Sequence, residues 1–391
     1  MSLKVGVVGS TGFANAFIPL FKAHPLVGEV VVCDLVAEKR EEAAARHGIQ
    51  RTSPSLEALL ESDVDAVAII TQPWLHGPQA LQALRAGKDV YCAVPIGRSV
   101  EEVAALVRAV EETGRVYMTG ETSYYYPAAL YCRERFRAGD FGRVVYGEGE
   151  YYHDWDHGLY GVQRTRGGQR WLEHAGAPPM YYPTHSMSMI VSVTGAYATH
   201  VSCRGVVDRG RDDGVYGERA NVYGNVFSNE SALFGMSDGS AARINEFRRV
   251  GHPGTVRMAL FGTEGCFEQN LAGAVWLTKD RSAAQRLDET LAVGGVMNAG
   301  DEFAGVSAVH PVARLPREFA GLPNGHLGSH QFLVHDFVRA CVAGEQPPNN
   351  VWMAARYCVP GLVAHESARQ GGVLLEIPDF GPGVPAGAST D

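Results

Sequence analysis

The chain has 391 residues, and 34 Lys and Arg against 43 Asp and Glu give it a net charge of -9. This length suits two domains with buried cores, and the acidic balance disfavours nucleic acid as a partner. No apolar run approaches the roughly 18 to 20 residues that span a membrane, and the N-terminus shows no signal-peptide layout. We therefore expect a cytoplasmic protein with no membrane contact.

The first third alternates short apolar runs with amphipathic segments, which is typical of a parallel sheet covered by helices. Ser99 and Glu102 form a capping box, and Gly87 and Gly114 suit helix C-terminal caps. The predicted strands cover residues 3–9, 27–34, 64–71, 88–94 and 115–120, with helices over 37–48 and 99–114. The sequence thus predicts a doubly wound α/β Rossmann domain over residues 1–122.

After a predicted helix over residues 127–142, the pattern changes to strand-like runs separated by polar turns. The runs cover residues 143–155, 199–207, 218–228, 231–247 and 256–270. Over residues 123–391 we therefore predict an α+β domain with a large, open, mostly antiparallel sheet.

Two helices are expected to close this second domain, over residues 328–344 and 352–372. Pro360 weakens the second prediction because a proline inside a helix removes a hydrogen bond. Residues 290–324 show little periodicity and are expected to form a long loop. Residues 381–391 are expected to be a flexible tail.

A glycine-bearing turn, "VGSTGF", connects the first strand to the first helix. Its backbone amides could bind a pyrophosphate, and the candidate residues are Gly9, Ser10, Thr11, Gly12 and Phe13. Asp34 ends the second strand, where an acid would accept the ribose hydroxyls and repel a 2'-phosphate. We therefore expect NAD, with NADP less favoured. The alternative is a plain turn in which Asp34 caps the next helix.

Six further segments carry a resemblance that runs nearly end to end. They are "TQPWLH", "AGKDVYCAVP", "GETSYYYP", "FGRVVYGEGEYYHD", "PPMYYPTHSMSMIVSVTG" and "GSHQFLVHDFVRA". In this order they resemble the Gfo/Idh/MocA family of nicotinamide-dependent sugar and polyol oxidoreductases. The resemblance implies a Rossmann domain followed by a domain on an open sheet, which this family often uses for dimer or tetramer contacts. A homodimer or homotetramer is therefore expected.

The same resemblance implies which further residues lie near the nicotinamide cofactor. It adds Thr71, Gln72, Pro73 and His76 to the glycine loop and Asp34. Three residues of the next strand end and one after the last strand complete the predicted cofactor site: Ala93, Val94, Pro95 and Glu121.

Two departures from the family pattern concern catalysis. The family's Glu-Lys-Pro is Ala93, Val94 and Pro95 here, so the lysine expected beside the nicotinamide is absent. In the family's Asp-x-x-x-His signature, aligning the histidine with His185 puts Tyr181 at the aspartate position.

The remaining candidates for catalysis surround His185, which can act as acid or base because an imidazole titrates near neutral pH. Tyr181 or Tyr182 could donate to a developing oxyanion in place of the lysine, or could simply pack. His153 and Asp154 could assist as a base pair, ligate a metal or lie in a solvated loop. No metal is expected because no spacing specifies a ligand set.

Four other residues are candidates for substrate contact. Each has a plain structural alternative, namely core packing for the tryptophan and a solvated loop or helix start for the histidines. They are Trp171, His157, His326 and His330.

These observations favour an NAD-dependent oxidoreductase that acts on a sugar, polyol or related hydroxylated compound, with His185 as acid or base. A second hypothesis is a lyase or glycosidase that retains NAD, works through a transient keto intermediate and shows no net redox change. A third is a ligand-binding protein that has lost its chemistry.

Overall fold

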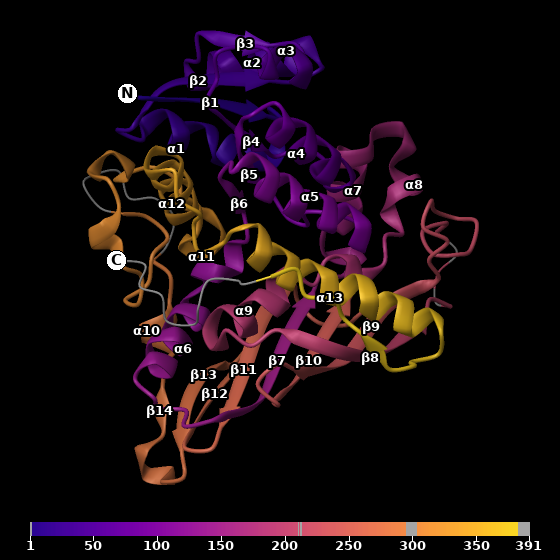
Figure 1. The fold of residues 1–391 in the computed structure, drawn as a ribbon. Helices are drawn as coiled ribbons and strands as arrows, with labels where there is room; N and C mark the ends of the chain where they lie inside the picture. Colours follow the sequence, from indigo (N-terminus) through magenta and orange to yellow (C-terminus); the bar gives the residue numbers. More distant parts are fainter. Residues whose placement is uncertain (1, 210, 212, 295–302, 382–391) are drawn as a thin grey trace.

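Two sheets organise the computed structural model, which describes residues 2–209, 211, 213–294 and 303–381 (Figure 1). The first sheet has six parallel strands in the order β3-β2-β1-β4-β5-β6. Its strands are β1 (Leu3–Val8), β2 (Val27–Cys33), β3 (Arg51–Ser53), β4 (Ala66–Ile69), β5 (Asp89–Cys92) and β6 (Tyr117–Thr119). The order reverses between β1 and β4, which is the point where doubly wound folds bind their ligands. The Rossmann prediction is confirmed.

Five helices alternate with these strands and cover both faces of the sheet (Figure 1). The predicted caps are present, because the Ser99 hydroxyl accepts a hydrogen bond from the Glu102 amide at 3.1 Å and Gly114 adopts a left-handed φ of +63°. The helices are α1 (Ile18–Ala23), α2 (Ala37–His47), α3 (Leu56–Leu60), α4 (His76–Arg85) and α5 (Val100–Thr113).

The second sheet has nine strands in the order β14-β13-β12-β11-β7-β10-β9-β8-β15. β7 and β10 pair in parallel and the other neighbours pair antiparallel, so the predicted mostly antiparallel sheet is confirmed. The strands are β7 (Val144–Tyr152), β8 (Ala198–Val207), β9 (Phe227–Met236), β10 (Ala241–Phe247), β11 (Thr255–Gly262), β12 (Gly265–Asn270), β13 (Gly273–Thr278), β14 (Gln285–Arg286) and β15 (Leu375–Glu376).

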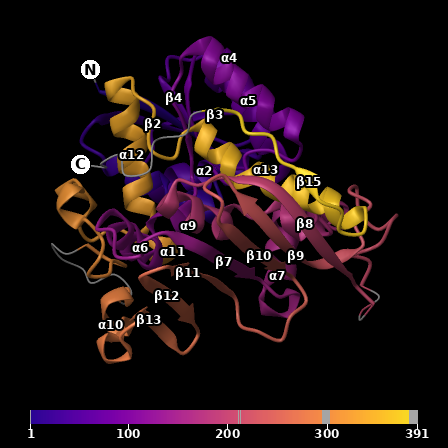
Figure 2. The same ribbon diagram turned by 60° about the horizontal axis from the view of Figure 1, so that its bottom comes forward.

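Three helices pack on one face of this sheet: α6 (Pro127–Arg137), α9 (Thr184–Thr194) and α13 (Val351–Arg369) (Figure 2). Gly149 on β7 lets α9 approach closely, because a Cβ there would lie 2.4 Å from the carbonyl oxygen of Ser186. α13 continues as one helix through Pro360, so the doubt that this proline raised is resolved in favour of the helix.

Four shorter helices and one long one complete the described fold: α7 (Leu159–Gly167), α8 (Trp171–Ala175), α10 (Asp288–Leu291), α11 (Gly325–Gly328) and α12 (His330–Ala343). α12 lies beside α1 and returns the chain to the Rossmann core (Figure 1). Its Phe337 is fully buried, with ring centroids 6.2 Å from Phe21 and 5.7 Å from Tyr91. A domain boundary at residue 122 stays a prediction. One hydrophobic core contains residues from both sides of this position.

The structure corrects the expected strand over residues 218–228. Residues 218–226 form turns, and β9 begins only at Phe227. The Asn221 amide group donates to the carbonyl oxygens of Val215 and Asn225 at 2.9 and 3.0 Å, so side-chain bonds replace a strand ladder here.

The expected loop over residues 290–324 contains short 3-10 turns at Val312–Arg314 and Arg317–Phe319. Part of this loop, residues 295–302, and the expected tail from residue 382 lie outside the described residues. None of the described helices has the length and apolar character that a membrane crossing requires.

Candidate functional site

The glycine loop lies between β1 and α1, at the switch point of the parallel sheet. Gly9 has a φ of +101°, and a Cβ there would lie 2.4 Å from the carbonyl oxygen of Ile70, so only glycine fits. Gly12 has a φ of +55°, with no described atom within 4 Å of its would-be Cβ. Open space in front of a loop at this position fits a pyrophosphate.

Asp34 lies against the loop. Its Oδ2 accepts hydrogen bonds from the Ser10 hydroxyl at 2.6 Å and the Ser10 amide at 3.2 Å. Its Oδ1 accepts from the Val36 amide at 2.9 Å, but Val36 is the N-cap residue of α2 and no side chain caps this helix, so Asp34 is not the helix cap of the alternative interpretation. The carboxylate therefore joins loop and strand end, at the place that suits a ribose diol.

The two neighbouring strand ends are joined by His76, which is buried. Its Nδ1 lies 2.9 Å from the carbonyl oxygen of Pro95, and its Nε2 lies 3.1 Å from that of Thr71. Burial lowers the pKa of this imidazole to about 4, so it is neutral. A neutral imidazole has one N–H, so His76 donates to one of these carbonyl oxygens and only packs against the other, and both ring nitrogens face the protein.

The segment where the family lysine is missing is apolar. Ala93 and Val94 are buried, and Pro95 lines the cavity described below together with Pro73. The Thr71 hydroxyl donates to the Gln79 side chain at 2.6 Å, and the Gln72 amide group donates to the carbonyl oxygen of Arg166 at 3.4 Å.

A buried carboxylate and imidazole form the central pair of the site. His185 Nδ1 lies 2.6 Å from Glu121 Oε1, and Glu121 is fully buried. The same carboxylate oxygen accepts from the Ser123 amide at 2.9 Å and the Ser123 hydroxyl at 2.8 Å. The sequence placed Glu121 among the cofactor contacts, and the structure places it as the partner of His185.

Burial and charge act in opposite directions on this pair. Burial raises the pKa of Glu121, but the charge and hydrogen bond of His185 and the Ser123 donors outweigh it, so the pKa is lowered. Burial lowers the pKa of His185, but Glu121 outweighs it, so the pKa is raised above 6.5. Since Nδ1 faces a carboxylate, Nε2 is the atom that can take or give a proton.

A second buried ion pair supports the same helix start. The Ser186 hydroxyl donates to Glu246 Oε1 at 2.6 Å, and Arg248 Nη2 donates to Glu246 Oε2 at 2.9 Å. Burial raises the pKa of Glu246 to about 7 although Arg248 opposes this shift. The Arg248 guanidinium lies 4.8 Å from the ring centroid of Tyr151.

Two tyrosines separate His185 from the cavity. The ring centroids of Tyr151 and Tyr182 lie 5.4 and 5.3 Å from that of His185. Burial raises the pKa of both phenols, which keeps them neutral and able to donate a hydrogen bond. The Tyr151 hydroxyl lies 2.9 Å from His153 Nδ1, and burial lowers the pKa of His153 to about 4.

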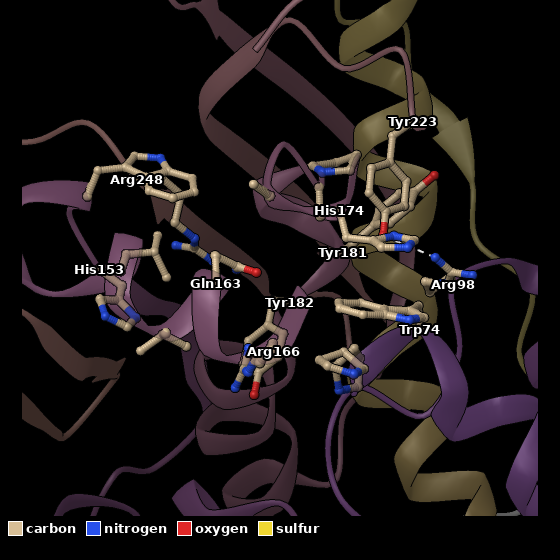
Figure 3. Close-up of a pocket in the computed structure, with 18 of the residues that line it drawn as sticks. Trp74, Arg98, His153, Gln163, Arg166, His174, Tyr181, Tyr182, Tyr223 and Arg248 are labelled. Atoms are coloured by element: carbon tan, nitrogen blue, oxygen red, sulfur yellow. Dashed lines mark hydrogen bonds between the residues drawn. The ribbon is translucent and has the colours of Figure 1, made fainter. Parts of the chain in front are cut away.

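The cavity itself lies between these tyrosines and the short helices α7 and α8 (Figure 3). Trp74 stacks on His174 with 4.0 Å between ring centroids, and Tyr223 lies beside them. Most of the wall is aromatic or apolar with a few polar groups, which is the usual character of a small-molecule site. Among the described residues, no cluster of His, Cys, Asp and Glu could hold a metal ion.

The other predicted catalytic residues lie in different places. Tyr181 lines the cavity but packs against His365 and Tyr223, with 5.3 and 5.9 Å between ring centroids, and not against His185. Asp154 accepts from the backbone amides of Asp156 and Val250 at 2.8 and 2.7 Å, so its carboxylate holds two turns.

The four candidate substrate contacts lie in three different places. His157 is exposed, and Trp171 packs in a small aromatic cluster with Trp155. His326 Nδ1 lies 3.0 Å from His330 Nε2, and both rings contact Phe13 of the glycine loop edge-on at 5.0 and 5.2 Å. These two histidines border the cofactor loop.

Sequence reasoning missed several groups of this site. Tyr151 was treated only as part of the strand-like run over residues 143–155, and Arg166 and Arg248 had no signal because neither lies in a recognised motif. The pairing of Glu121 with His185 spans 64 positions and depends on the fold. The single usable hint was that Glu121 follows the last strand of the parallel sheet, at the edge where such sheets bind ligands.

The comparisons with known proteins agree with this geometry. Residues 3–121 match the family model described as an oxidoreductase family with an NAD-binding Rossmann fold. The chain is 27% identical to a glycosyl hydrolase family 109 protein of Streptomyces filamentosus. The alignment covers 97% of this chain and 77% of that protein. The chain is 26% identical to one of Saccharopolyspora erythraea, again over 97% of this chain and covering 83% of the relative.

Solved structures share the whole fold. A levoglucosan dehydrogenase in complex with NADH and levoglucosan superimposes with a TM-score of 0.75 at 19% identity, covering 97% of this chain and all of the other. The myo-inositol 2-dehydrogenase of Lactobacillus plantarum gives a TM-score of 0.69 at 17% identity with the same coverages. At these identities the likeness shows the fold.

Proposed function

We propose that the protein, whose residues 3–121 match an oxidoreductase family with an NAD-binding Rossmann fold, is an NAD-dependent enzyme acting on a carbohydrate. We further propose that it cleaves a glycosidic bond and leaves the cofactor without net redox change. The observation that carries the proposal is the buried Glu121–His185 pair, 2.6 Å apart, beside an aromatic cavity that has no catalytic lysine.

The residues that would hold NAD are those of the switch point. Gly9 and Gly12 leave room for the pyrophosphate, and Asp34 would accept the ribose hydroxyls. When bound there, NAD supplies a site that can take a hydride from a sugar ring carbon and give it back.

His185 is the proposed base for the sugar hydroxyl. Its Nε2 takes the proton, while Glu121 fixes the ring orientation and stabilises the imidazolium that results. The neutral phenols of Tyr151 and Tyr182 donate to the oxygen that gains negative charge, which is the task that the absent lysine would otherwise perform.

A ketone on the ring makes the hydrogen on the adjacent carbon acidic; a base can remove it, and the aglycone on the next carbon departs as a protonated alcohol. Water then adds across the resulting double bond before the ketone is reduced again. The site needs acid and base groups beyond a single lysine for these additional proton transfers. The two tyrosines of the cavity wall and His185 behind them supply these groups. The glycosyl hydrolase names of the relatives that span almost the whole chain support this proposal over simple dehydrogenation.

Activity of site variants tests the proposal. We would incubate NAD-loaded protein with a panel of aryl glycosides, following release of the aryl alcohol and NADH absorbance together. His185→Asn should slow release by about a hundredfold or more, the usual scale for loss of an acid-base group. His200→Asn, a change at an exposed histidine on β8, is the control and should leave the rate unchanged.

Two outcomes would contradict the proposal. Stoichiometric NADH with no bond cleavage would favour the dehydrogenase that the same pair could also support. Equal rates for wild-type protein and His185→Asn would remove the pair from catalysis.

A further inference from the structure

The cavity beside the catalytic pair has an unusual charge balance. Three arginines line it, and none of its described lining residues is Asp or Glu. Arg248 is neutralised by Glu246 at 2.9 Å. The arginines that remain are Arg98 and Arg166, one on each side of the aromatic wall (Figure 3).

The guanidinium of Arg98 has only a neutral hydrogen-bond partner among the described residues, while its backbone amide donates to Glu102. Its Nη1 donates to the Tyr223 hydroxyl at 3.0 Å, and its guanidinium lies 5.7 Å from the ring centroid of Tyr223. Its Nε is buried with no hydrogen-bond acceptor among the described residues. A buried donor without a partner costs free energy that a bound acceptor would offset.

Arg166 lies on α7 and extends beside Tyr182 (Figure 3). Its backbone carbonyl oxygen accepts from Gln72, but its guanidinium forms no ion pair or hydrogen bond with any described residue. The exposed Arg164, two positions earlier on the same helix, lies over the rings of Tyr160 and Trp171 instead. Arg166 is therefore the cation of this helix that lines the cavity.

We infer that the substrate is an acidic sugar whose carboxylate is bound by Arg166, with Arg98 as a second contact. The inference rests on the proposed function, because it assigns the substrate class of the same site. A guanidinium pairs with a carboxylate through two parallel hydrogen bonds, and the aromatic walls suit the apolar faces of a sugar ring. With no acid in the wall to repel it, an anionic substituent is the complement of this cavity.

The cofactor's phosphates are the competing partner for Arg166, since Gln72 is a cofactor-side residue. The experiment therefore measures NAD and sugars separately. We would titrate the NAD-loaded protein with D-glucuronate, D-galacturonate and the matching neutral sugars by calorimetry, and titrate the stripped protein with NAD. Sugar binding can be measured without turnover. The substrate-class inference and the proposed glycosidase activity can therefore be contradicted independently of each other.

We expect each bound uronate to bind more tightly than its neutral counterpart and its affinity to fall with added salt. Arg166→Gln should weaken uronate binding about tenfold or more, the scale of a charged hydrogen bond, and leave NAD affinity unchanged. Arg98→Gln should weaken it less. Arg164→Gln is the matched control and should change neither affinity.

Two results would overturn the inference. One is that no uronate binds more tightly than its neutral counterpart, whether or not the neutral sugars bind. The other is that Arg166→Gln weakens NAD binding and leaves uronate binding intact. Thermal unfolding of each variant shows that a lost affinity is not a lost fold, and Arg98→Gln carries the test if Arg166→Gln does not fold.

Discussion

At the scale of single residues, the chemistry depends on one carboxylate oxygen. Glu121 Oε1 faces His185 Nδ1 and two Ser123 donors, while Oε2 is buried with no described partner. This arrangement favours the ionised carboxylate and the imidazole that donates from Nδ1. The proposed base is thus built from a strand end and a helix start 64 positions apart.

The pH dependence of activity follows from the raised pKa of His185. As a base it must be neutral, so the rate should fall as pH drops through a pKa above 6.5. Glu121→Gln removes the charge that raises this pKa and leaves burial, which lowers it. We therefore expect the acid limb of kcat/KM to move to lower pH and kcat to fall. An unchanged acid limb in the variant would show that another group controls it.

Asp34 is expected to determine the preference for NAD over NADP. Its carboxylate would bind the ribose diol and repel a 2'-phosphate, so Asp34→Arg should weaken NAD binding about tenfold or more and improve NADP binding. Fluorescence titration of stripped protein with both nucleotides measures the change. Asp65→Asn serves as the control. Asp65 lies at the opposite end of the sheet, where its carboxylate accepts a hydrogen bond from the Lys4 amide. Unaltered preference in Asp34→Arg would place the ribose elsewhere.

At the scale of elements, α12 stabilises the domain that binds the cofactor, although it follows every strand of the second sheet except β15 in sequence. Phe337 is fully buried against Phe21 and Tyr91, so Phe337→Ala should lower the free energy of unfolding by about 3 to 5 kcal/mol. Val342→Ala, at the exposed end of α12, should cost well under 1 kcal/mol. Urea unfolding of both variants measures the difference, and similar losses would contradict the assignment of α12 to this core.

The elements that the sequence failed to predict are those around the cavity. α7 and α8 carry five glycines within and beside them and follow a polar run, so no apolar stripe marks them as helices. Residues 218–226 alternate as a strand would, but the buried Asn221 satisfies their backbone groups instead. Hydrophobic periodicity detects only the residues that face a hydrophobic core. Segments that line a cavity lack this pattern, so it does not predict them.

At the scale of the whole molecule, the parallel and mixed sheets were predictable because their strands are apolar at regular spacing. The glycine loop and Asp34 were predictable because backbone geometry and a fixed strand order bring them together. The partner of His185 could not be predicted, nor could the cavity arginines that lack an ion pair. Both depend on which side chains meet across the domain interface. The expected homo-oligomer stays a prediction.

The central claim is that hydride leaves and returns within one turnover, and counting turnovers per bound NAD tests it most directly. Protein carrying one equivalent of NAD, with none added, would be incubated with an aryl glycoside that it cleaves, and its nucleotide then released and identified. The account predicts many product molecules per NAD and oxidised NAD at the end. Product limited to one equivalent, with NADH recovered, or undiminished cleavage after NAD is removed, would contradict it.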